Sequence, residues 1–294
     1  MRNQRQLCFI PSGGLGNRMR AVASAYLLHS QTGVEVSVKW FRDWALDAPF
    51  ASLFLPFSEA GFSIADARRW EYAVFDRPRR KNLFVPRLFQ SLMFGDRIDE
   101  QRVTPLKHLD FDFEQWARTG SKRKYMSCYQ VFGSPQNHLY PTLFRPTPKV
   151  DDLIGHYCRH FAPRTIGLHI RRTDNQESID KSPLYLFFDA VDLEVAFDNQ
   201  VKVFVATDDE PTKRSLVERY GSRVITSEQL ADRGSVAGIQ GAVAEMYTLS
   251  RCAKIYGSAG SSFSVMAARV GNTPLEILEA GSKNFEKTEK QACL

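Results

Sequence analysis

The sequence predicts an α/β protein built from two doubly wound, mostly parallel β-sheets of the Rossmann type. The second half alternates apolar strand candidates with amphipathic helix candidates, a pattern in which helices cover both faces of a parallel sheet. The first half opens in the same way, with an apolar strand, a glycine turn and a helix. A length of 294 residues accommodates two domains.

Five strands are expected in the second half, at residues 165–170, 201–206, 223–226, 254–256 and 275–278. Helices are expected between them, at about 183–196, 212–220, 239–252 and 262–270. The first helix has Ser182 as its expected N-cap and Pro183 as its first residue, and Gly221 and Gly271 stand where two helices should end. Because the loops after parallel strands meet at one edge of the sheet, ligands are expected at that edge.

The first half is predicted less completely. Residues 7–10 and 34–38 read as strands on either side of a helix at about 17–31, and residues 125–132 read as a last strand. Residues 40–125 are rich in aromatic side chains and show few clear periods, so we read them as irregular.

The best candidate for a linker is the proline-rich stretch 133–149. We therefore expect a first domain at residues 1–148 and a second domain at residues 149–294. No internal repeat or low-complexity tract interrupts either half.

The composition is that of a globular protein without a membrane span. No stretch approaches the roughly 20 apolar residues that a span requires, and the apolar stretch near the N-terminus is too short for a signal peptide. The five cysteines have neither paired nor metal-type spacing, which favours free thiols in a reducing compartment. We therefore expect a cytoplasmic protein without a zinc site.

The net charge of +6 arises from local basic clusters. Solvated surface is the commoner role of such clusters, and attraction of an anionic substrate or peripheral association with a membrane is the alternative. No motif that reads RNA or DNA accompanies them, so nucleic acid is not an expected partner. The clusters are Arg68-Arg69, then Arg77, Arg79, Arg80 and Lys81, then Lys122-Arg123-Lys124.

The hexapeptide His169-Ile-Arg171-Arg172-Thr-Asp174 directly follows the strand expected at 165–170. Arginine holds phosphate oxygens through a planar, permanently charged fork, so two arginines at the end of a strand suit a diphosphate site. A surface pair of arginines bridged to Asp174 is the alternative.

A glycine turn, SGGLGN at residues 12–17, follows the first predicted strand and opens a helix. Its candidate ligand-contacting residues are Gly14, Gly16 and Asn17, because glycine lets the backbone approach an anion closely. The turn lacks both the dinucleotide glycine spacing and the lysine of a P-loop, and a tight strand–helix turn is the alternative.

A second turn, GSAGSSFS at residues 257–264, joins a predicted strand to a helix. The backbone N–H groups and hydroxyls of Ser261, Ser262 and Ser264 are candidates to hold a phosphate. A serine N-cap on a buried helix is the alternative, and both roles are compatible. Phe263 is expected in the core rather than as a stacking group.

Glu245 lies on the helix expected at 239–252. An ionised carboxylate is the group that accepts hydrogen bonds from the guanine N1–H and exocyclic amine together. Exposure to solvent is the ordinary alternative for an acid on a helix.

These motifs, in this order, resemble those of the fucosyltransferase superfamily. The HIRRTD piece is similar to a motif of α-1,6-fucosyltransferases, including the rhizobial nodulation enzyme, and GGLGN and SSFS are similar to motifs of bacterial α-1,2-fucosyltransferases. Protein O-fucosyltransferases belong to the same superfamily. FVATDD at 204–209 and the stretch from Glu245 through Ser264 extend the resemblance, which covers about residues 5–30 and 125–280.

The resemblance implies a GT-B-like pair of Rossmann domains facing a cleft, GDP-fucose as the donor substrate without a further cofactor, inversion at the anomeric carbon and no essential metal. By position in the motifs, Arg171 would hold the β-phosphate with support from His169 and Arg172. The backbone of Ser262 and Phe263 would meet the diphosphate.

Further roles follow from the same resemblance. Asp208 would support the nucleotide pocket, and Asn17 would lie near the transferred sugar and the acceptor. Glu245 matches a guanine-reading aspartate, and the change from Asp to Glu leaves the base specificity open. The catalytic base is expected shortly after the HIRRTD motif, where Glu177 is the first candidate and Asp180 its competitor.

The sequence thus predicts an inverting, metal-independent bacterial fucosyltransferase that modifies a polysaccharide or glycolipid precursor, with the acceptor on the first domain and the donor on the second. Two alternatives stay open: a transferase for another nucleotide sugar, and a non-catalytic relative that binds a nucleotide or glycan. The acceptor, the linkage and the oligomeric state are not predicted.

Overall fold

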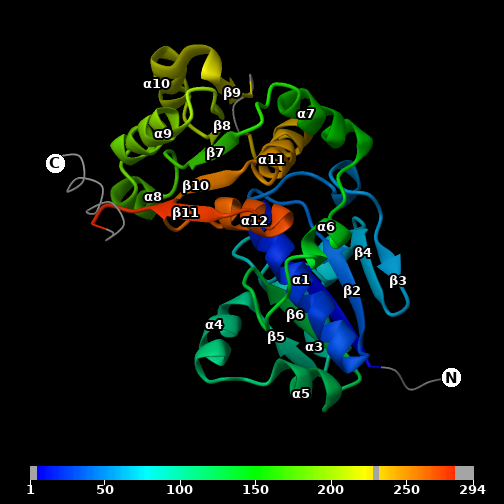
Figure 1. The fold of residues 1–294 in the computed structure, drawn as a ribbon. Helices are drawn as coiled ribbons and strands as arrows, with labels where there is room; N and C mark the ends of the chain where they lie inside the picture. The colour runs from blue at the N-terminus through cyan, green and yellow to red at the C-terminus, as the bar shows by residue number, and fades with distance from the viewer. Residues whose placement is uncertain (1–4, 228–231, 282–294) are drawn as a thin grey trace. The chain divides into compact units, whose positions relative to one another are not determined.

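The computed structural model describes residues 5–227 and 232–281, and these form two compact α/β units (Figure 1). Unit 1 contains the chain up to Thr147 together with Arg233–Gln240, and unit 2 contains the remainder. The first of these divisions follows Thr147, and the assignment of whole domains to residues 1–148 and 149–294 stays a prediction. The four described cysteines are free thiols, and Cys293 lies outside the described residues.

Unit 2 is built on a fully parallel sheet of five strands in the order β11-β10-β7-β8-β9. All five strands expected in this half are present. This is the doubly wound Rossmann order 3-2-1-4-5, with the topological switch point between β7 and β10. The strands are β7 (Thr165–Ile170), β8 (Lys202–Thr207), β9 (Val224–Thr226), β10 (Lys254–Ser258) and β11 (Leu275–Leu278).

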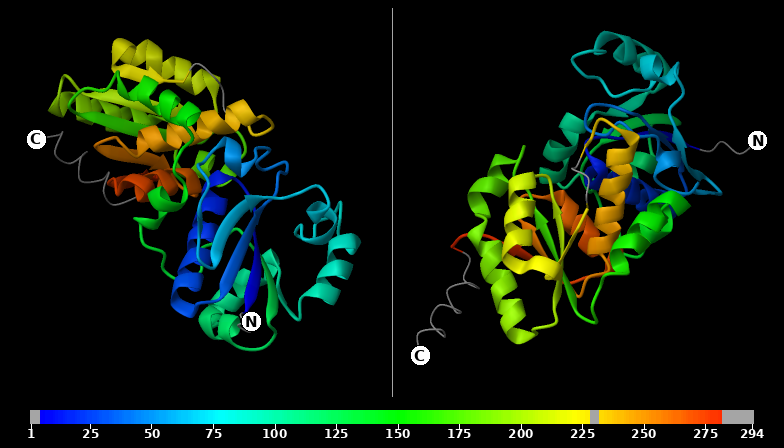
Figure 2. Two further views of the ribbon diagram at one scale, coloured as in Figure 1. Left: turned by 90° about the vertical axis from the view of Figure 1, so that its right-hand side faces the viewer. Right: turned by 90° about the horizontal axis from the view of Figure 1, so that it is seen from above.

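Helices cover both faces of this sheet (Figure 2). On one face Ile166 and Leu168 of β7 pack in a buried cluster with Phe187 and Val191 of α9. On the other face α11 approaches so closely that a Cβ at Gly167 would lie 2.7 Å from the Leu249 side chain. The helical elements are α7 (Pro148–Cys158), α8 (Gln176–Lys181), α9 (Tyr185–Phe197), α10 (Glu210–Tyr220), η2 (Gly221–Arg223), α11 (Val236–Leu249) and α12 (Ser262–Gly271).

The N-terminal end of α9 differs from the expectation, because Leu184 and not Ser182 is its N-cap. The Ser182 hydroxyl accepts from the backbone N–H of Ala259 at 2.8 Å and donates to the Leu278 carbonyl at 2.5 Å. A buried hydroxyl satisfied by two backbone groups is unavailable as a cap. Ser182 therefore links the start of α9 to β11 and to the loop after β10.

Of the two expected helix ends, Gly221 is the C-cap of α10 as predicted. Gly271 instead remains inside α12, and Asn272 is the left-handed C-cap with φ 52°. A Cβ at Gly271 would lie 2.0 Å from the Ser250 carbonyl oxygen. Glycine is therefore required at position 271 because α12 packs closely against the backbone of Ser250, and not because the helix ends there.

Unit 1 has a six-stranded sheet in the order β3-β4-β2-β1-β6-β5, parallel except for the pair β3–β4. Helix α1 covers one face of it (Figure 1). The strands are β1 (Gln6–Pro11), β2 (Glu35–Trp40), β3 (Ser58–Glu59), β4 (Phe62–Asp66), β5 (Asp96–Ile98) and β6 (Arg123–Cys128).

The reading of residues 40–125 as irregular is wrong, because this region holds three strands and several helices. These elements span between two and ten residues, and helices this short depend on tertiary packing rather than on a visible period. The helical elements of unit 1 are α1 (Leu15–Thr32), η1 (Phe50–Ser52), α2 (Glu71–Val74), α3 (Phe84–Met93), α4 (Glu100–His108), α5 (Phe113–Arg118) and α6 (Leu139–Leu143).

A buried ionic network lies at the carboxyl ends of β1 and β2. The fully buried Arg18 donates to the Gly13 carbonyl at 2.8 Å and pairs with Asp43 at 2.9 Å. Asp43 also pairs with Arg77 at 3.1 Å and with Arg79 at 3.5 Å. Burial lowers the pKa of Arg18 to about 10, against the opposing effect of Asp43. Arg77 and Arg79, which the sequence grouped in a surface cluster, are thus used inside unit 1.

Replacing Asp43 with asparagine should destabilise the fold by about 3–5 kcal/mol, because the substitution leaves the buried Arg18 without its counter-charge. Urea unfolding measures this loss. The matched control is Asp47→Asn, which breaks the half-exposed pair with Arg42 and should cost less than about 1 kcal/mol. Equal, small losses in the two variants would contradict the role given to the network.

Candidate functional site

The switch point of unit 2 brings two predicted motifs side by side. Strands β7 and β10 pair in parallel with His169 opposite Gly257, so the hexapeptide 169–174 and the turn 257–264 leave the sheet together. The Ser258 hydroxyl joins them, since it accepts from the Arg171 N–H at 3.1 Å and donates to the His169 carbonyl at 3.4 Å. Sequence reasoning did not single out Ser258, although it lies within a motif that we quoted.

The Arg171 guanidinium lies between two carboxylates. Nη1 pairs with Asp208 at 3.0 Å, and Nη2 donates to Asp174. Asp208 is nearly buried and also accepts from the Arg172 N–H at 2.8 Å and the Thr173 hydroxyl at 2.6 Å. The Arg171 side chain is 17% exposed, whereas that of Asp174 is half-exposed. Asp208 therefore orders the loop after β7 and fixes one edge of a permanent cation.

Arg172 points away from Arg171, toward the start of α9. Its Nη2 donates to the Ser182 carbonyl at 2.6 Å and its Nη1 to the Ile179 carbonyl at 3.4 Å. Burial lowers its pKa, with Asp209 and Asp208 opposing. These contacts make Arg172 a support for the segment 179–182.

His169 is buried and stacks on Phe263, with ring centroids 4.7 Å apart and planes 20° apart. Burial, followed by the charge of Arg171, lowers its pKa to about 3, so the imidazole is neutral at physiological pH. Its Nδ1 has no hydrogen-bond partner among the described residues. Phe263 is half-buried and forms a stacking contact within the protein, which differs from the plain core position that we expected.

The turn after β10 presents the N-terminus of α12 beside this cluster. Ser261 is the N-cap, in line with the alternative of a serine cap on this helix, and its hydroxyl accepts from the Phe263 N–H at 3.4 Å. The hydroxyl of Ser264 is buried and donates to the Ser261 carbonyl. Gly260 has φ +68°, a conformation that favours glycine. The first N–H groups of a helix lack partners in the helix itself, and the helix dipole favours an anion there.

Of the two candidate bases, only Glu177 lies against this turn. A Cβ at Gly260 would lie 2.9 Å from Glu177 Oε2. The exposed Glu177 pairs with Lys181 at 2.8 Å, a contact that raises the pKa of Lys181. Asp180 is exposed and accepts from Gln176 at 2.7 Å.

The short helix α8, which carries both acids, is tied to the same turn. The Asn175 amide donates to the Gly260 carbonyl at 3.3 Å, and the Ser178 hydroxyl donates to the Ala259 carbonyl at 2.6 Å. Asn175 also caps α8 through Ser178. These contacts fix the position of α8 beside the N-terminus of α12.

Glu245 is buried in α11 rather than exposed. Its Oε1 accepts from the Ser227 hydroxyl at 2.6 Å, and Lys213 donates to the Ser227 carbonyl at 2.9 Å. Desolvation raises the pKa of Glu245 to about 7, with Ser227 and Lys213 opposing. The hydrogen bond from Ser227 and the charge of Lys213 offset only part of the cost of burying this carboxylate. Such a group is suited to a ligand that supplies further hydrogen-bond donors.

The paired acids after β8 are not arranged as a metal site. Asp208 holds Arg171, and Asp209 caps α10 by accepting from the Thr212 N–H at 2.9 Å and hydroxyl at 2.6 Å. In the described parts of the chain, no group of three or more His, Cys, Asp or Glu side chains is placed to hold a metal ion. Nor does any helix described here have the length and apolar character needed to cross a membrane.

The glycine turn of the first motif lies in unit 1, where Gly14 is the N-cap of α1 and Gly16 is buried in its first turn. Asn17 is half-buried, and a Cβ at Gly13 would lie 2.9 Å from its amide nitrogen. Arg18 anchors this turn through the Gly13 carbonyl. The role of Asn17 near the sugar stays a prediction.

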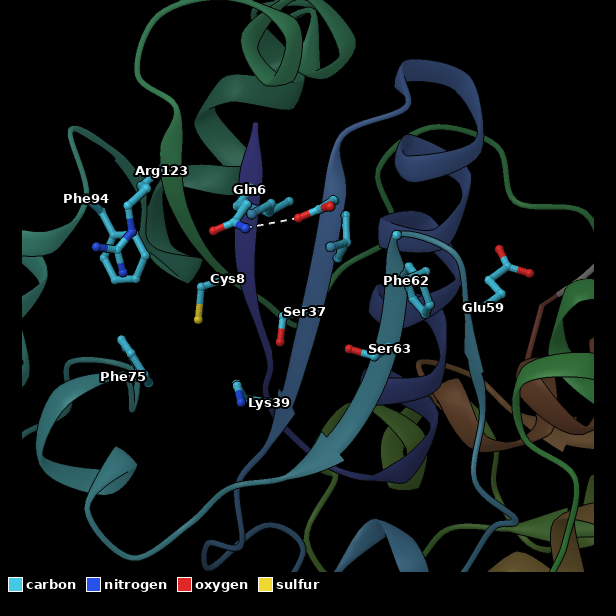
Figure 3. Close-up of a pocket in the computed structure, with 14 residues that line it drawn as sticks. Gln6, Cys8, Ser37, Lys39, Glu59, Phe62, Ser63, Phe75, Phe94 and Arg123 are labelled. Atoms are coloured by element: carbon cyan, nitrogen blue, oxygen red, sulfur yellow. Dashed lines mark hydrogen bonds between the residues drawn. The ribbon is translucent and has the colours of Figure 1, made fainter. Parts of the chain in front are cut away.

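A cavity of about 400 Å³ lies on one face of the sheet of unit 1 (Figure 3). Several of its polar side chains already have partners, since Gln6 donates to Glu35 at 3.0 Å and Lys39 pairs with Glu71 at 2.9 Å. None of the predicted site residues is among those that line it. We therefore assign it no ligand.

The architecture has known counterparts. No protein-family model and no curated protein matches the sequence. The solved fucosyltransferase NodZ from Bradyrhizobium is 23% identical with a TM-score of 0.64, over 90% of this chain and 91% of that chain. NodZ α-1,6-fucosyltransferase has been co-crystallised with GDP and soaked with GDP-fucose.

Two further structures are similar. FUT1 from Arabidopsis thaliana, in complex with GDP, is 17% identical with a TM-score of 0.62, over 94% of this chain and 70% of that chain. POFUT1 in complex with GDP-fucose is 11% identical with a TM-score of 0.56, over 95% and 99%. The resemblance of the motifs to fucosyltransferases is thus confirmed in the fold, which is GT-B-like.

The raised pKa of Glu245 predicts a pH-dependent stability. Between about pH 4.5 and 7 the folded chain keeps this proton and the unfolded chain releases it, so the free energy of unfolding falls as the pH rises. Glu245→Gln removes the titrating group, so the wild type should lose about 3 kcal/mol more than the variant across this window. Urea unfolding at several pH values measures the difference. The exposed Glu218→Gln serves as control, and parallel slopes for wild type and Glu245→Gln would refute the assignment.

Proposed function

We propose that the chain is an inverting, metal-independent glycosyltransferase that moves fucose from GDP-fucose to a hydroxyl of a glycan or glycolipid precursor in the bacterial cytoplasm. The observation that carries the proposal is that the loop with Arg171 and the turn that opens α12 leave the sheet from paired strands at the switch point of unit 2. The shared fold of NodZ, whose crystals have been soaked with GDP-fucose, supports the choice of donor.

The diphosphate would bind between Arg171 and the first turn of α12. The nearly buried Asp208 would stay paired with Nη1 of Arg171. A β-phosphate oxygen would replace the half-exposed Asp174 at Nη2. The N–H groups of Ser262 and Phe263 would face the same phosphates. Arginine suits this role because its charge is permanent and its donors form a planar fork.

The chemistry needs charge neutralisation on the leaving group. The bond from the anomeric carbon to the β-phosphate oxygen breaks, and its electron pair stays on GDP. Meanwhile the acceptor oxygen attacks from the opposite face, which inverts the configuration. Fixed donors aimed at the developing charge stabilise this step without a metal ion, and one such donor contributes about 3–4 kcal/mol. Arg171 is the strongest of these donors.

We propose Glu177 as the base that takes the proton of the acceptor hydroxyl. Its carboxylate lies against Gly260, on the same turn that would hold the diphosphate. Its pair with Lys181 is exposed, so solvent screens the pair and it opens at little cost. Asp180 is turned to Gln176 instead.

The acceptor is proposed to bind on unit 1, with Asn17 near the transferred sugar. The glycine turn 12–17 leaves β1 at the carboxyl edge of the sheet, where ligands of such sheets bind. The network around Arg18 holds this turn rigid.

Glu245 favours one second candidate, a transferase for a different nucleotide sugar. Its carboxylate is buried and bonded to Ser227, so its ability to accept from guanine depends on displacement of that hydroxyl. The base specificity therefore needs a direct test.

A thermal-shift panel with GDP-fucose, GDP, GDP-mannose, UDP and NAD, each with and without EDTA, tests the donor class. A ligand at 100 times its Kd stabilises the folded state by about 2.7 kcal/mol. We expect stabilisation by the guanine nucleotides that EDTA does not change. A response to UDP alone would favour the second candidate, and a response to NAD would refute both.

Arg171→Ala is the matched variant for this panel. Its melting temperature without ligand should equal that of the wild type, because Asp208 keeps the Arg172 N–H and the Thr173 hydroxyl as partners. Stabilisation by GDP should vanish, and transfer should fall by a factor of about 100–1,000 or more. Unchanged turnover would remove Arg171 from the donor site.

Glu177→Gln should lower the single-turnover rate of transfer about 100-fold or more, while the Kd for GDP-fucose stays unchanged. Asp180→Asn, on the same helix, is the control and should retain the wild-type rate. If Asp180→Asn loses the activity instead, the base is Asp180. If the wild type binds GDP-fucose without transfer or hydrolysis, the chain is a non-catalytic relative.

A further inference from the structure

Helix α3 in unit 1 carries an apolar surface that no described residue covers. Phe84, Leu88 and Leu92 lie one turn apart along the helix, and Phe84 and Leu92 are 84% and 77% exposed. Val85 and Phe89 extend the same surface. We name these five residues the α3 apolar face. A surface helix of a globular protein ordinarily turns its apolar stripe to the core, so this orientation is inverted.

Contacts of the buried face of α3 hold the helix in this orientation. Pro86 and Gln90 are the buried residues of the helix. The Gln90 amide donates to the buried Asp76 carbonyl at 2.8 Å. A rotation that buried the apolar face would break this bond and expose Pro86. In both panels of Figure 2 the cyan segment that contains α2 and α3 projects from the sheet of unit 1.

Unpaired cations flank the α3 apolar face. Arg80 and Lys81 directly precede α3 and Arg87 lies on it; all three are exposed and have no ion-pair partner among the described residues. Residues 67–95 contain seven basic residues and two acids. Both acids are buried, Glu71 against Lys39 and Asp76 against Arg79, so neither screens the outer surface.

An exposed tryptophan, Trp70, lies at the N-terminal end of α2, next to α3. Trp70 caps α2, which packs against α3, and is 54% exposed. Arg68 and Arg69, both exposed, precede it. Tryptophan is enriched where protein meets the headgroup layer of a membrane, and arginine beside it contacts anionic headgroups.

We propose that the α3 apolar face and its flanking cations bind the surface of a membrane that contains anionic lipid. The helix lies in the headgroup layer, with the apolar side chains among the acyl chains and Arg80, Lys81 and Arg87 at the phosphates. A second copy of this chain is a poorer occupant, because a two-fold contact would bring these cations together without an acid between them. The proposal does not depend on fucose transfer.

Vesicle co-sedimentation of the full chain tests the proposal. Vesicles of phosphatidylcholine alone are compared with vesicles that also contain phosphatidylglycerol. The wild type should bind the anionic vesicles, with an affinity that falls as salt is added, and should bind neutral vesicles far less. The variants F84S/L88S/L92S and R80Q/K81Q/R87Q should each lower the affinity at least about tenfold.

Phe197→Ser is the matched control, since Phe197 is 80% exposed on unit 2 and lies outside the surface. It should bind vesicles as the wild type does. Equal binding by the wild type and F84S/L88S/L92S overturns the proposal, as does binding to neither kind of vesicle. A wild-type dimer in sedimentation velocity that F84S/L88S/L92S converts to a monomer, without vesicle binding, would assign the surface to a contact between copies.

Discussion

Much of unit 2 depends on the carboxylate of Asp208. It lies just beyond β8, is nearly removed from water, and accepts from the Arg171 guanidinium, the Arg172 N–H and the Thr173 hydroxyl of the neighbouring strand's loop. One buried anion thereby sets the path of the backbone after β7 and holds one edge of the Arg171 guanidinium. The parallel pairing of β7 with both β8 and β10 makes this possible, since it places three loops at one edge.

Desolvation then shifts the pKa values of His169 and Glu245 at this edge of the sheet toward their neutral forms. Arg171 stays charged because guanidinium cannot be deprotonated in proteins. His169, more deeply buried beside it, has its pKa lowered to about 3 and is a neutral stacking partner of Phe263. Glu245 is poised near pH 7 and depends on what binds next to it. In the complex that we propose, a diphosphate would meet the charged Arg171 beside a neutral His169.

The sequence was informative wherever a local pattern carries the structure. Strands of unit 2, the C-cap Gly221 and the placement of Arg171 at a strand end follow from apolar runs, turn residues and strand–helix alternation. Interactions that join distant segments were not visible: Asp43 holding Arg18, Arg77 and Arg79, or Ser182 bonded to Ala259 and Leu278 instead of capping a helix. Helix α3 was missed although Phe84, Leu88 and Leu92 recur at helical spacing, and residues 40–125 form short elements that rely on packing.

Each unit has an arginine–carboxylate cluster after its central strand. The two clusters differ in how far their side chains are buried, and this difference determines whether a solute can reach them. Arg18 in unit 1 has no exposed surface, and its partner Asp43 is equally enclosed, so no solute reaches the pair and it acts as a fixed support. Arg171 in unit 2 is partly exposed and one of its two acids, Asp174, is half in water. Of these two clusters, the one around Arg171 has an exposed acid, Asp174. A more highly charged anion can displace that acid at small cost. The same chemistry thus stabilises one unit and offers a binding site in the other, which is why we place the donor on unit 2.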